Sequence, residues 1–184
     1  VYEVGAHAFE NCAIETLETS DVYIDKTDAT HKIVNSCVKI DNNLLTIKGY
    51  AFRNTSVETQ TLPERTASIE EYAFADNFRL KELNFAGGAL TSLVIGDYAF
   101  FASSGLQKLV LPSNLTRIGD GAFSECRNVN SITFAESTEK LVIGEEAFSE
   151  IHYLYEAEIP ANVTSLGRGV FKGDTRLKYV YFAL

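Results

Sequence analysis

The sequence predicts an α/β repeat fold, a solenoid of about eight coils that are each 20–26 residues long. Each coil is expected to hold short strands and a single helical turn. Two observations predict this fold. A phrase of one apolar residue, three mostly small or polar residues and then Ala-Phe recurs along the chain. A second phrase, with apolar residues in the order Leu-x-x-Leu-x-Leu, follows the Ala-Phe.

The first phrase sets the period of the repeat. Residues 118–123 (Ile-Gly-Asp-Gly-Ala-Phe) are a clear copy, and in the last copy valine replaces the alanine. The phenylalanine of the phrase stands at seven positions: Phe9, Phe52, Phe74, Phe100, Phe123, Phe148 and Phe171. A unit of this size cannot bury its apolar ridge alone, so stacked copies are expected to align their phenylalanines in a column that forms the core.

The spacing of these phenylalanines predicts one degenerate copy. The separations are 43, 22, 26, 23, 25 and 23 residues, so the first is about twice the others. A weak copy within residues 19–46, with Ile24 at the leading apolar position and Ala29 at the phenylalanine position, divides this gap and gives eight copies. Two copies are longer, and their extra residues near 86–89 and 135–139 are expected to form loops at one edge.

The second phrase predicts a strand. In residues 106–112 (Leu-Gln-Lys-Leu-Val-Leu-Pro) the last residues before the proline alternate between apolar and polar, which is the period of a strand with one buried face. The proline lacks an amide donor and ends the strand. A further short segment, such as 115–118, leads into the next copy.

These two phrases together resemble a known family. Residues 118–134 follow the pattern of leucine-rich repeat proteins of the BspA-like subclass, including the cysteine at Cys126. The resemblance covers nearly the whole chain and is weakest between residues 19 and 46. It implies a single leucine-rich repeat domain over residues 1–184. It also implies an extracellular or cell-surface protein that adheres to host cells or matrix proteins. Because neither end carries the polar cover that solenoids need, we expect a fragment of a longer array. End-to-end self-association is an alternative that would also cover the ends.

The composition excludes two classes of partner. The chain has 16 basic and 25 acidic residues, a net charge of −9, and no basic cluster. Such a chain is poorly suited to bind nucleic acid or anionic membranes. No apolar run approaches the roughly 20 residues that span a bilayer, so direct membrane insertion is not expected.

The sequence offers no catalytic, metal-binding or cofactor-binding pattern, so an enzyme is not expected. There is no Gly-x-Ser-x-Gly phrase, and the three histidines are isolated. Cys12 and Cys126 occupy the same repeat position and are predicted to be small buried residues with free thiols. Cys37 is expected on the polar face of a strand. Acidic residues such as Asp97 and Asp120 are predicted to cap the helical turn rather than to bind calcium.

Three asparagines stand in Asn-x-Ser/Thr sequons: Asn54, Asn114 and Asn162. They are candidates for N-glycosylation. Asn114 and Asn162 occupy the same repeat position, so turn formation by asparagine is the alternative interpretation.

The polar positions of the Leu-x-x-Leu-x-Leu strands are expected to line one face, which is the candidate binding site. The candidate residues are Lys108, Val110, Tyr155, Glu156, Glu158, Lys178, Tyr179 and Tyr181. Tyrosine clusters favour contacts with proteins. The alternative is that the last two tyrosines pack under a further coil.

The predicted function is non-enzymatic binding of a protein or glycoprotein from a host cell or matrix by an adhesin-like surface protein. Two alternatives stay open. One is a rigid spacer that displays other domains, and the other is an intracellular scaffold for protein interactions. Fold alone does not decide among them.

Overall fold

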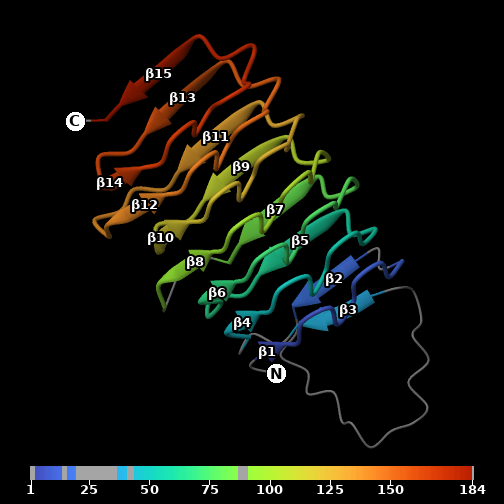
Figure 1. Ribbon diagram of the computed structural model, residues 1–184. Coiled ribbons are helices and arrows are strands. Elements are labelled where there is room, and N and C mark those ends of the chain that lie inside the picture. The colour runs from blue at the N-terminus through green and yellow to red at the C-terminus, as the bar shows by residue number, and fades with distance from the viewer. Residues whose placement is uncertain (1–2, 14–15, 20–36, 41–43, 87–90, 184) are drawn as a thin grey trace, which may run out of the picture.

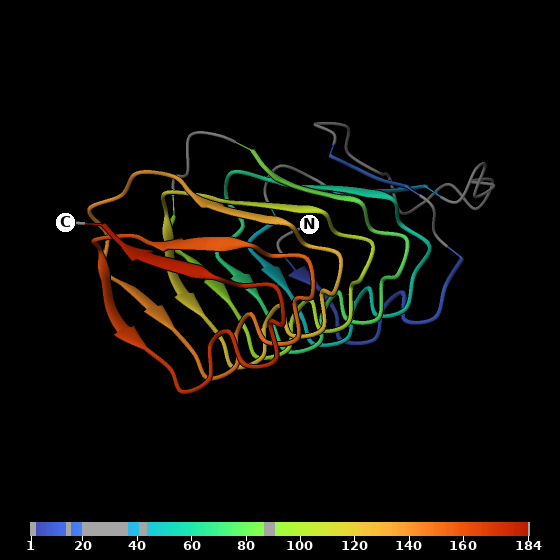
Figure 2. The same ribbon diagram turned by 90° about the horizontal axis from the view of Figure 1, so that it is seen from above.

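The computed structural model describes residues 3–13, 16–19, 37–40, 44–86 and 91–183. In these residues the chain winds into a parallel β-solenoid with fifteen strands and no helix (Figure 1). Figure 2 shows the coils stacked behind one another, with the C-terminal coils at the left of the view. Two strand-bearing faces run along the stack, and the core lies between them.

The first face is a single continuous sheet. Its neighbouring strands are all parallel, and each strand leads into one Ala-Phe turn or its Val-Phe equivalent. In spatial order the strands are β1 (Glu3–Val4), β4 (Thr46–Ile47), β6 (Ser68–Ile69), β8 (Leu93–Ile95), β10 (Leu115–Ile118), β12 (Leu141–Ile143) and β14 (Val163–Leu166).

The second face, called the strand-lined face below, is formed by the Leu-x-x-Leu-x-Leu segments. Its strands are β2 (Thr16–Thr19), β3 (Cys37–Ile40), β5 (Thr59–Leu62), β7 (Glu82–Phe85), β9 (Lys108–Leu111), β11 (Ser131–Phe134), β13 (Glu156–Ile159) and β15 (Tyr179–Phe182). They form three parallel sheets, ordered β3-β2-β5-β7, β9-β11 and β13-β15.

The strand-lined face is interrupted at the two longer copies. β7 is not hydrogen-bonded to β9, and β11 is not hydrogen-bonded to β13. β7 lies in the copy with a spacing of 26 residues and β11 in the copy with a spacing of 25 residues. The extra residues come directly after these two strands, so the insertions and the lost strand pairing occur at the same places in the face. Residues 87–90 of the first insertion lie outside the described residues.

The buried phenylalanine column is confirmed. Five of its side chains have no exposed surface: Phe52, Phe74, Phe100, Phe123 and Phe148. Successive rings in this run lie 5.1–5.6 Å apart between centroids and are almost parallel. Phe9 and Phe171 pack against the same core and are partly buried. One repeated residue therefore supplies the axis of the solenoid.

The expected helical turn at Ala-Phe was wrong. Two residues with positive φ flank each phenylalanine, as Tyr72 (52°) and Asp76 (59°) flank Phe74. Left-handed residues at this spacing prevent a helix from propagating. The amide of Phe74 instead donates to the carbonyl of Ala99 in the next coil at 2.7 Å. The segment is a pair of tight turns whose amides join neighbouring coils.

The expected eighth coil was also wrong. β1 pairs directly with β4, β2 pairs with β5, and the rings of Phe9 and Phe52 stack at 5.2 Å. β3, from the degenerate copy, lies on the outer side of β2 and not between two coils. Since that copy has no phenylalanine for the column, direct stacking of Phe9 on Phe52 keeps the ring contact. Ile24 and Ala29 lie outside the described residues.

Candidate binding face

The outward positions of β9 and β13 hold four of the predicted site residues. Along each strand exposed and buried residues alternate, so Lys108 and Val110 of β9 point out between buried Leu109 and Leu111. Glu156 and Glu158 of β13 point out in the same way. Val110 is 59% exposed, although its coil has a neighbour on both sides. The sequence period therefore correctly predicted that these side chains point outward.

The predicted tyrosines form a cluster on β15 and at the residue before β13. The ring of Tyr155 meets that of Tyr179 edge to face at 5.6 Å, and Tyr179 stacks on Tyr181 at 6.2 Å. The Lys178 ammonium lies 5.5 Å from the centre of the Tyr155 ring, a cation–π distance. The three tyrosines are 48%, 48% and 52% exposed. We call Tyr155, Lys178, Tyr179 and Tyr181 the tyrosine cluster.

The register of β15 decides how its tyrosines are oriented. Tyr179 pairs with Glu156 and Tyr181 with Glu158, which are outward residues. Val180 and Phe182 pair with Ala157 and Ile159, which are core residues. The core column therefore continues through Val180 and Phe182, and the two tyrosines belong to the outer face.

A second aromatic pair was missed from the sequence. Tyr153 is 50% exposed, and the Arg176 guanidinium lies 4.8 Å from the centre of its ring. Tyr153 and Arg176 are 23 residues apart, as are Tyr155 and Lys178. The repeat period could have found this pair, because residues one period apart lie side by side in neighbouring coils. It extends the exposed aromatic surface beyond the tyrosine cluster.

The charges of the strand-lined face differ along the stack. Near β5, Glu58 is bonded to both Arg79 and Lys81, and these two hydrogen bonds lower the pKa of its carboxyl. In the C-terminal part, Lys108, Glu156 and Glu158 form no ion pair with another described residue. The C-terminal half of the face therefore presents aromatic rings beside charges that are available to a partner.

Comparison with protein families identifies the repeat. The model of the BspA type leucine rich repeat region matches with six copies, over residues 1–81, 28–140 and 90–183. The chain belongs to the BspA-type leucine-rich repeat family. No curated protein matches it.

Three solved structures share this fold. The pneumococcal vaccine antigen PcpA is 24% identical with a TM-score of 0.71, and the match covers 93% of this chain and 41% of that one. A leucine-rich repeat protein from Bacteroides ovatus is 20% identical with a TM-score of 0.64, covering 100% and 53%. A leucine-rich cell surface protein from Faecalibacterium prausnitzii is 21% identical with a TM-score of 0.53, covering 100% and 59%. This chain thus spans only part of each of these proteins.

The sequons of this BspA-type chain contribute to stacking. The Asn114 side-chain amide donates to the carbonyl of Thr91 at 2.7 Å, and Asn162 donates to that of Glu139 at 2.6 Å. Each acceptor lies 23 residues earlier, in the preceding coil. Asn54 donates to the side chain of Asn11. Coil-to-coil bonding explains why the Asn-x-Thr phrase recurs, and glycosylation of the three asparagines stays a prediction.

The cysteine of the BspA-type pattern is a core residue. Cys126 is fully buried, and burial raises the pKa of its thiol far above the usual range, which makes it a poor nucleophile. Cys12 has a free thiol as well but is exposed, so the prediction that it is buried was wrong. It lies in the first described coil, whose outer side no described turn covers. The structure does not describe the side chain of Cys37, so its predicted place on the polar face stays a prediction.

The acidic residues before Ala-Phe have a different role from the predicted cap. The Asp97 carboxylate accepts from the backbone amide of Asp120 at 2.9 Å, and the Asp120 carboxylate accepts from that of Glu145 at 2.9 Å. Each carboxylate therefore binds an amide of the next coil and not one of its own turn. In the described part of the chain, no three His, Cys, Asp or Glu side chains gather as a metal site would need.

Two histidines lie beside carboxylates that the sequence did not pair with them. His7 contacts Glu10 at 2.7 Å, and His152 contacts Glu150 at 3.3 Å. Both pairs are exposed or partly exposed and lie in turns, and among the described residues neither is bonded to a nucleophilic side chain. No helix in the described residues is long and apolar enough to cross a bilayer.

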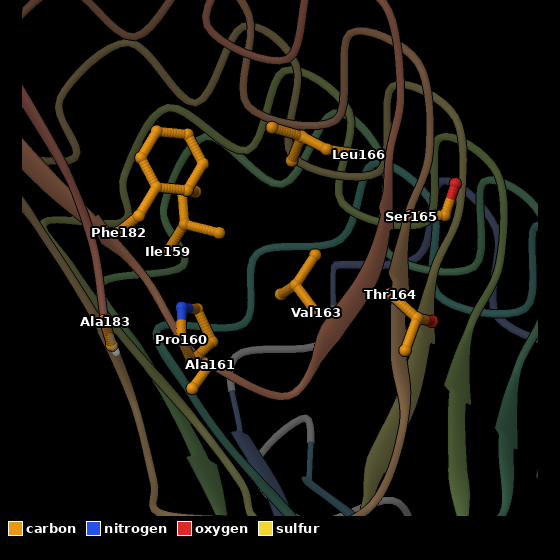
Figure 3. Close-up of a pocket in the computed structure, with 9 residues that line it drawn as sticks. All are labelled: Ile159, Pro160, Ala161, Val163, Thr164, Ser165, Leu166, Phe182 and Ala183. Atoms are coloured by element: carbon orange, nitrogen blue, oxygen red, sulfur yellow. The ribbon is translucent and has the colours of Figure 1, made fainter.

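A hollow of about 290 Å³ lies between β13, β14 and β15. Ile159, Leu166 and Phe182 gather around it in Figure 3. None of the residues that line it is titratable, so it offers no acid–base chemistry. It is the end of the core columns at the last described coil.

One buried carboxyl makes the stability of the last coil depend on pH. Asp174 is 9% exposed, and one carboxylate oxygen accepts from the amide of Ile151 at 2.7 Å, whereas the other has no partner. Asn77, at the same repeat position, donates its amide hydrogens to the carbonyls of Phe52 and Phe74. Burial raises the pKa of Asp174 to about 7.

We expect Asp174→Asn to stabilise the protein at about pH 8 and much less at about pH 5. The folded state binds the proton more tightly than the unfolded state does, so the contribution of Asp174 to stability is full below the usual pKa of 3.8. It is lost as the pH rises through about 7. Ionised aspartate has no hydrogen to donate, whereas the amide of asparagine can donate at every pH, as that of Asn77 does. Urea unfolding at both pH values measures the effect, and an equal difference at both would contradict this account.

Proposed function

We propose that this chain is a non-enzymatic binding module of an adhesin-like protein at the cell surface, and that its strand-lined face binds a protein or glycoprotein ligand. The observation that supports this most is the tyrosine cluster, in which three rings remain about half exposed. Tyrosine buries a large area on binding while losing little conformational freedom, so it is common among residues that dominate binding energy.

The exposure of Tyr153 and Tyr155 supports the same proposal. Their coil has neighbours on both sides, so stacking does not cover these rings. The two cations over their faces hold the rings in place. The surface location draws support from two structural relatives, one described as a vaccine antigen and one as a cell surface protein.

A rigid spacer is the second candidate function. The continuous phenylalanine column favours it, because stacked rings resist bending along the axis. A spacer would need no exposed aromatic surface, so the tyrosine cluster separates the two candidates. Self-association through the ends of the stack stays a prediction.

Capture from extracts of host cell surfaces and matrix tests the proposal. We expect wild-type protein to retain a ligand, and the Tyr155→Ser/Tyr179→Ser/Tyr181→Ser variant to lose it with an unchanged unfolding curve. The matched control is Phe78→Ser, which removes an aromatic ring that is 58% exposed on a different coil. If the triple variant and the control retain the same proteins as the wild type, the spacer is the better account.

A further inference from the structure

The interruption between β11 and β13 opens a groove in the strand-lined face. Its volume is about 550 Å³. Ile132, Thr133 and Phe134 of β11 line one side, Glu158 of β13 lines the other, and the inserted loop contributes Glu136. The groove lies beside the tyrosine cluster, because Glu158 pairs in register with Tyr181.

Two features of the sequence produce this groove. The insertion after Phe134 separates β11 from β13, so each strand is hydrogen-bonded on its other side only. The second feature is the small side chain of Ala157. The same repeat position holds a larger residue, Leu109 or Ile132, in the two preceding coils. As a result Ile132 and Phe134 remain partly exposed, whereas Leu109 and Leu111 are buried.

The groove combines negative charge with apolar lining residues. Glu136 and Glu158 line it and form no ion pair with another described residue. Ser137 and Asn162 also line it, but their side chains already bond to the carbonyls of Ser113 and Glu139. Two carboxylates and a partly exposed aromatic ring in the same groove therefore remain to recognise a ligand.

This combination selects a cation that carries apolar surface. An anionic ligand would meet two carboxylates on a chain with a net charge of −9. A metal ion would need more ligands, and no described cluster of three is present. Arginine fits better than lysine, since its planar guanidinium can bind a carboxylate with two hydrogen bonds and stack on an aromatic ring.

We propose that the groove between β11 and β13 takes an arginine side chain from an exposed segment of the protein partner. This inference rests on the proposed function and names the chemistry of the partner. The guanidinium lies between Glu136 and Glu158, and its alkyl stem covers Ile132 and Phe134.

NMR titration of the labelled chain with acetyl-glycyl-arginyl-glycinamide tests the groove directly. We expect amide shifts confined to β11, β13 and residues 135–137, which shrink as salt screens the charges. The matched probe replaces arginine with citrulline, which has nearly the same shape and no charge, and is expected to leave the spectrum unchanged. Absence of shifts, or equal shifts with both peptides, would overturn the inference.

Two variants separate the groove from other acidic sites. Glu136→Gln/Glu158→Gln is expected to abolish the arginine-dependent shifts, because it removes both charges and preserves the shape of the groove. Glu64→Gln removes an exposed carboxylate outside the groove and is expected to leave them unchanged. Equal shifts in the double variant and the wild type would show that arginine binds elsewhere.

The same double variant separates failure of the groove from failure of the proposed function. If it retains the captured ligand fully while the triple tyrosine variant loses it, the arginine inference is wrong and the binding function stands. If both variants lose the ligand and the peptide shifts are as expected, both proposals are supported.

Discussion

Replacing Phe123 by alanine is expected to lower the free energy of unfolding by about 3–5 kcal/mol. The side chain has no exposed surface and stacks between Phe100 at 5.1 Å and Phe148 at 5.6 Å. Its loss leaves a cavity in the middle of the column and removes ring contacts with two neighbouring coils. Each coil contacts only the coils next to it, so no other part of the protein can replace the lost contacts. Urea unfolding followed by circular dichroism measures the change.

The matched control for this prediction is Phe78→Ala. Phe78 lies in the copy that begins with Phe74 but is 58% exposed, so its loss is expected to change stability by about 0.5 kcal/mol or less. If Phe123→Ala and Phe78→Ala lower stability equally, the phenylalanine column does not hold the solenoid together.

The second large effect is expected at Gly119, where even the methyl group of alanine is too large for the space beside the preceding coil. A Cβ atom there would lie 2.5 Å from the backbone nitrogen of Asp97 and 2.5 Å from the carbonyl carbon of Gly96. Backbone atoms of the preceding coil cannot move aside as the end of a side chain can. We therefore expect Gly119→Ala to cost about 3 kcal/mol, at the upper end of the range for overpacking. Thermal unfolding measures it.

Gly5→Ala is the matched control, because Gly5 occupies the same repeat position and has no atom within 4 Å of an added Cβ. Its effect is expected to be neutral or slightly stabilising, within about 1 kcal/mol, as the unfolded chain loses freedom. A Gly119→Ala protein as stable as the wild type would show that the coils do not approach as closely as described.

The column and the outward positions could be predicted because they depend on periodicity alone. Phe52 to Phe171 recur at nearly constant spacing, and the alternation in β9 and β13 assigns Lys108, Val110, Glu156 and Glu158 to one face. Residues one period apart lie in neighbouring coils, so the contact between Tyr155 and Lys178 could also be predicted from the sequence.

The turns and the degenerate copy could not be predicted in the same way. The left-handed positions hold residues such as Tyr72, Ala102 and Glu146, which carry no local signal for positive φ. Nothing in residues 19–46 indicates that the first coil would stack on Phe52 directly. That choice depends on a ring contact between residues 43 positions apart, which single-sequence patterns do not report.

The groove beside β13 lies between these cases. The insertion after Phe134 and the small Ala157 are both visible in the sequence. Their joint consequence, two strands without a shared ladder, depends on which coils are neighbours and on how far an insertion displaces one of them. Only the three-dimensional structure shows that Glu136 and Glu158 line the same groove.

The role of the tyrosine cluster in binding is measured most directly by the affinity of the captured ligand for two immobilised proteins, the wild type and the Tyr155→Ser/Tyr179→Ser/Tyr181→Ser variant. If the tyrosine cluster is the centre of the binding face, the variant should bind at least about tenfold more weakly, a difference of about 1.4 kcal/mol. Its unfolding curve should match that of the wild type. Equal affinity of the two folded proteins would contradict the assignment of the strand-lined face as the binding site.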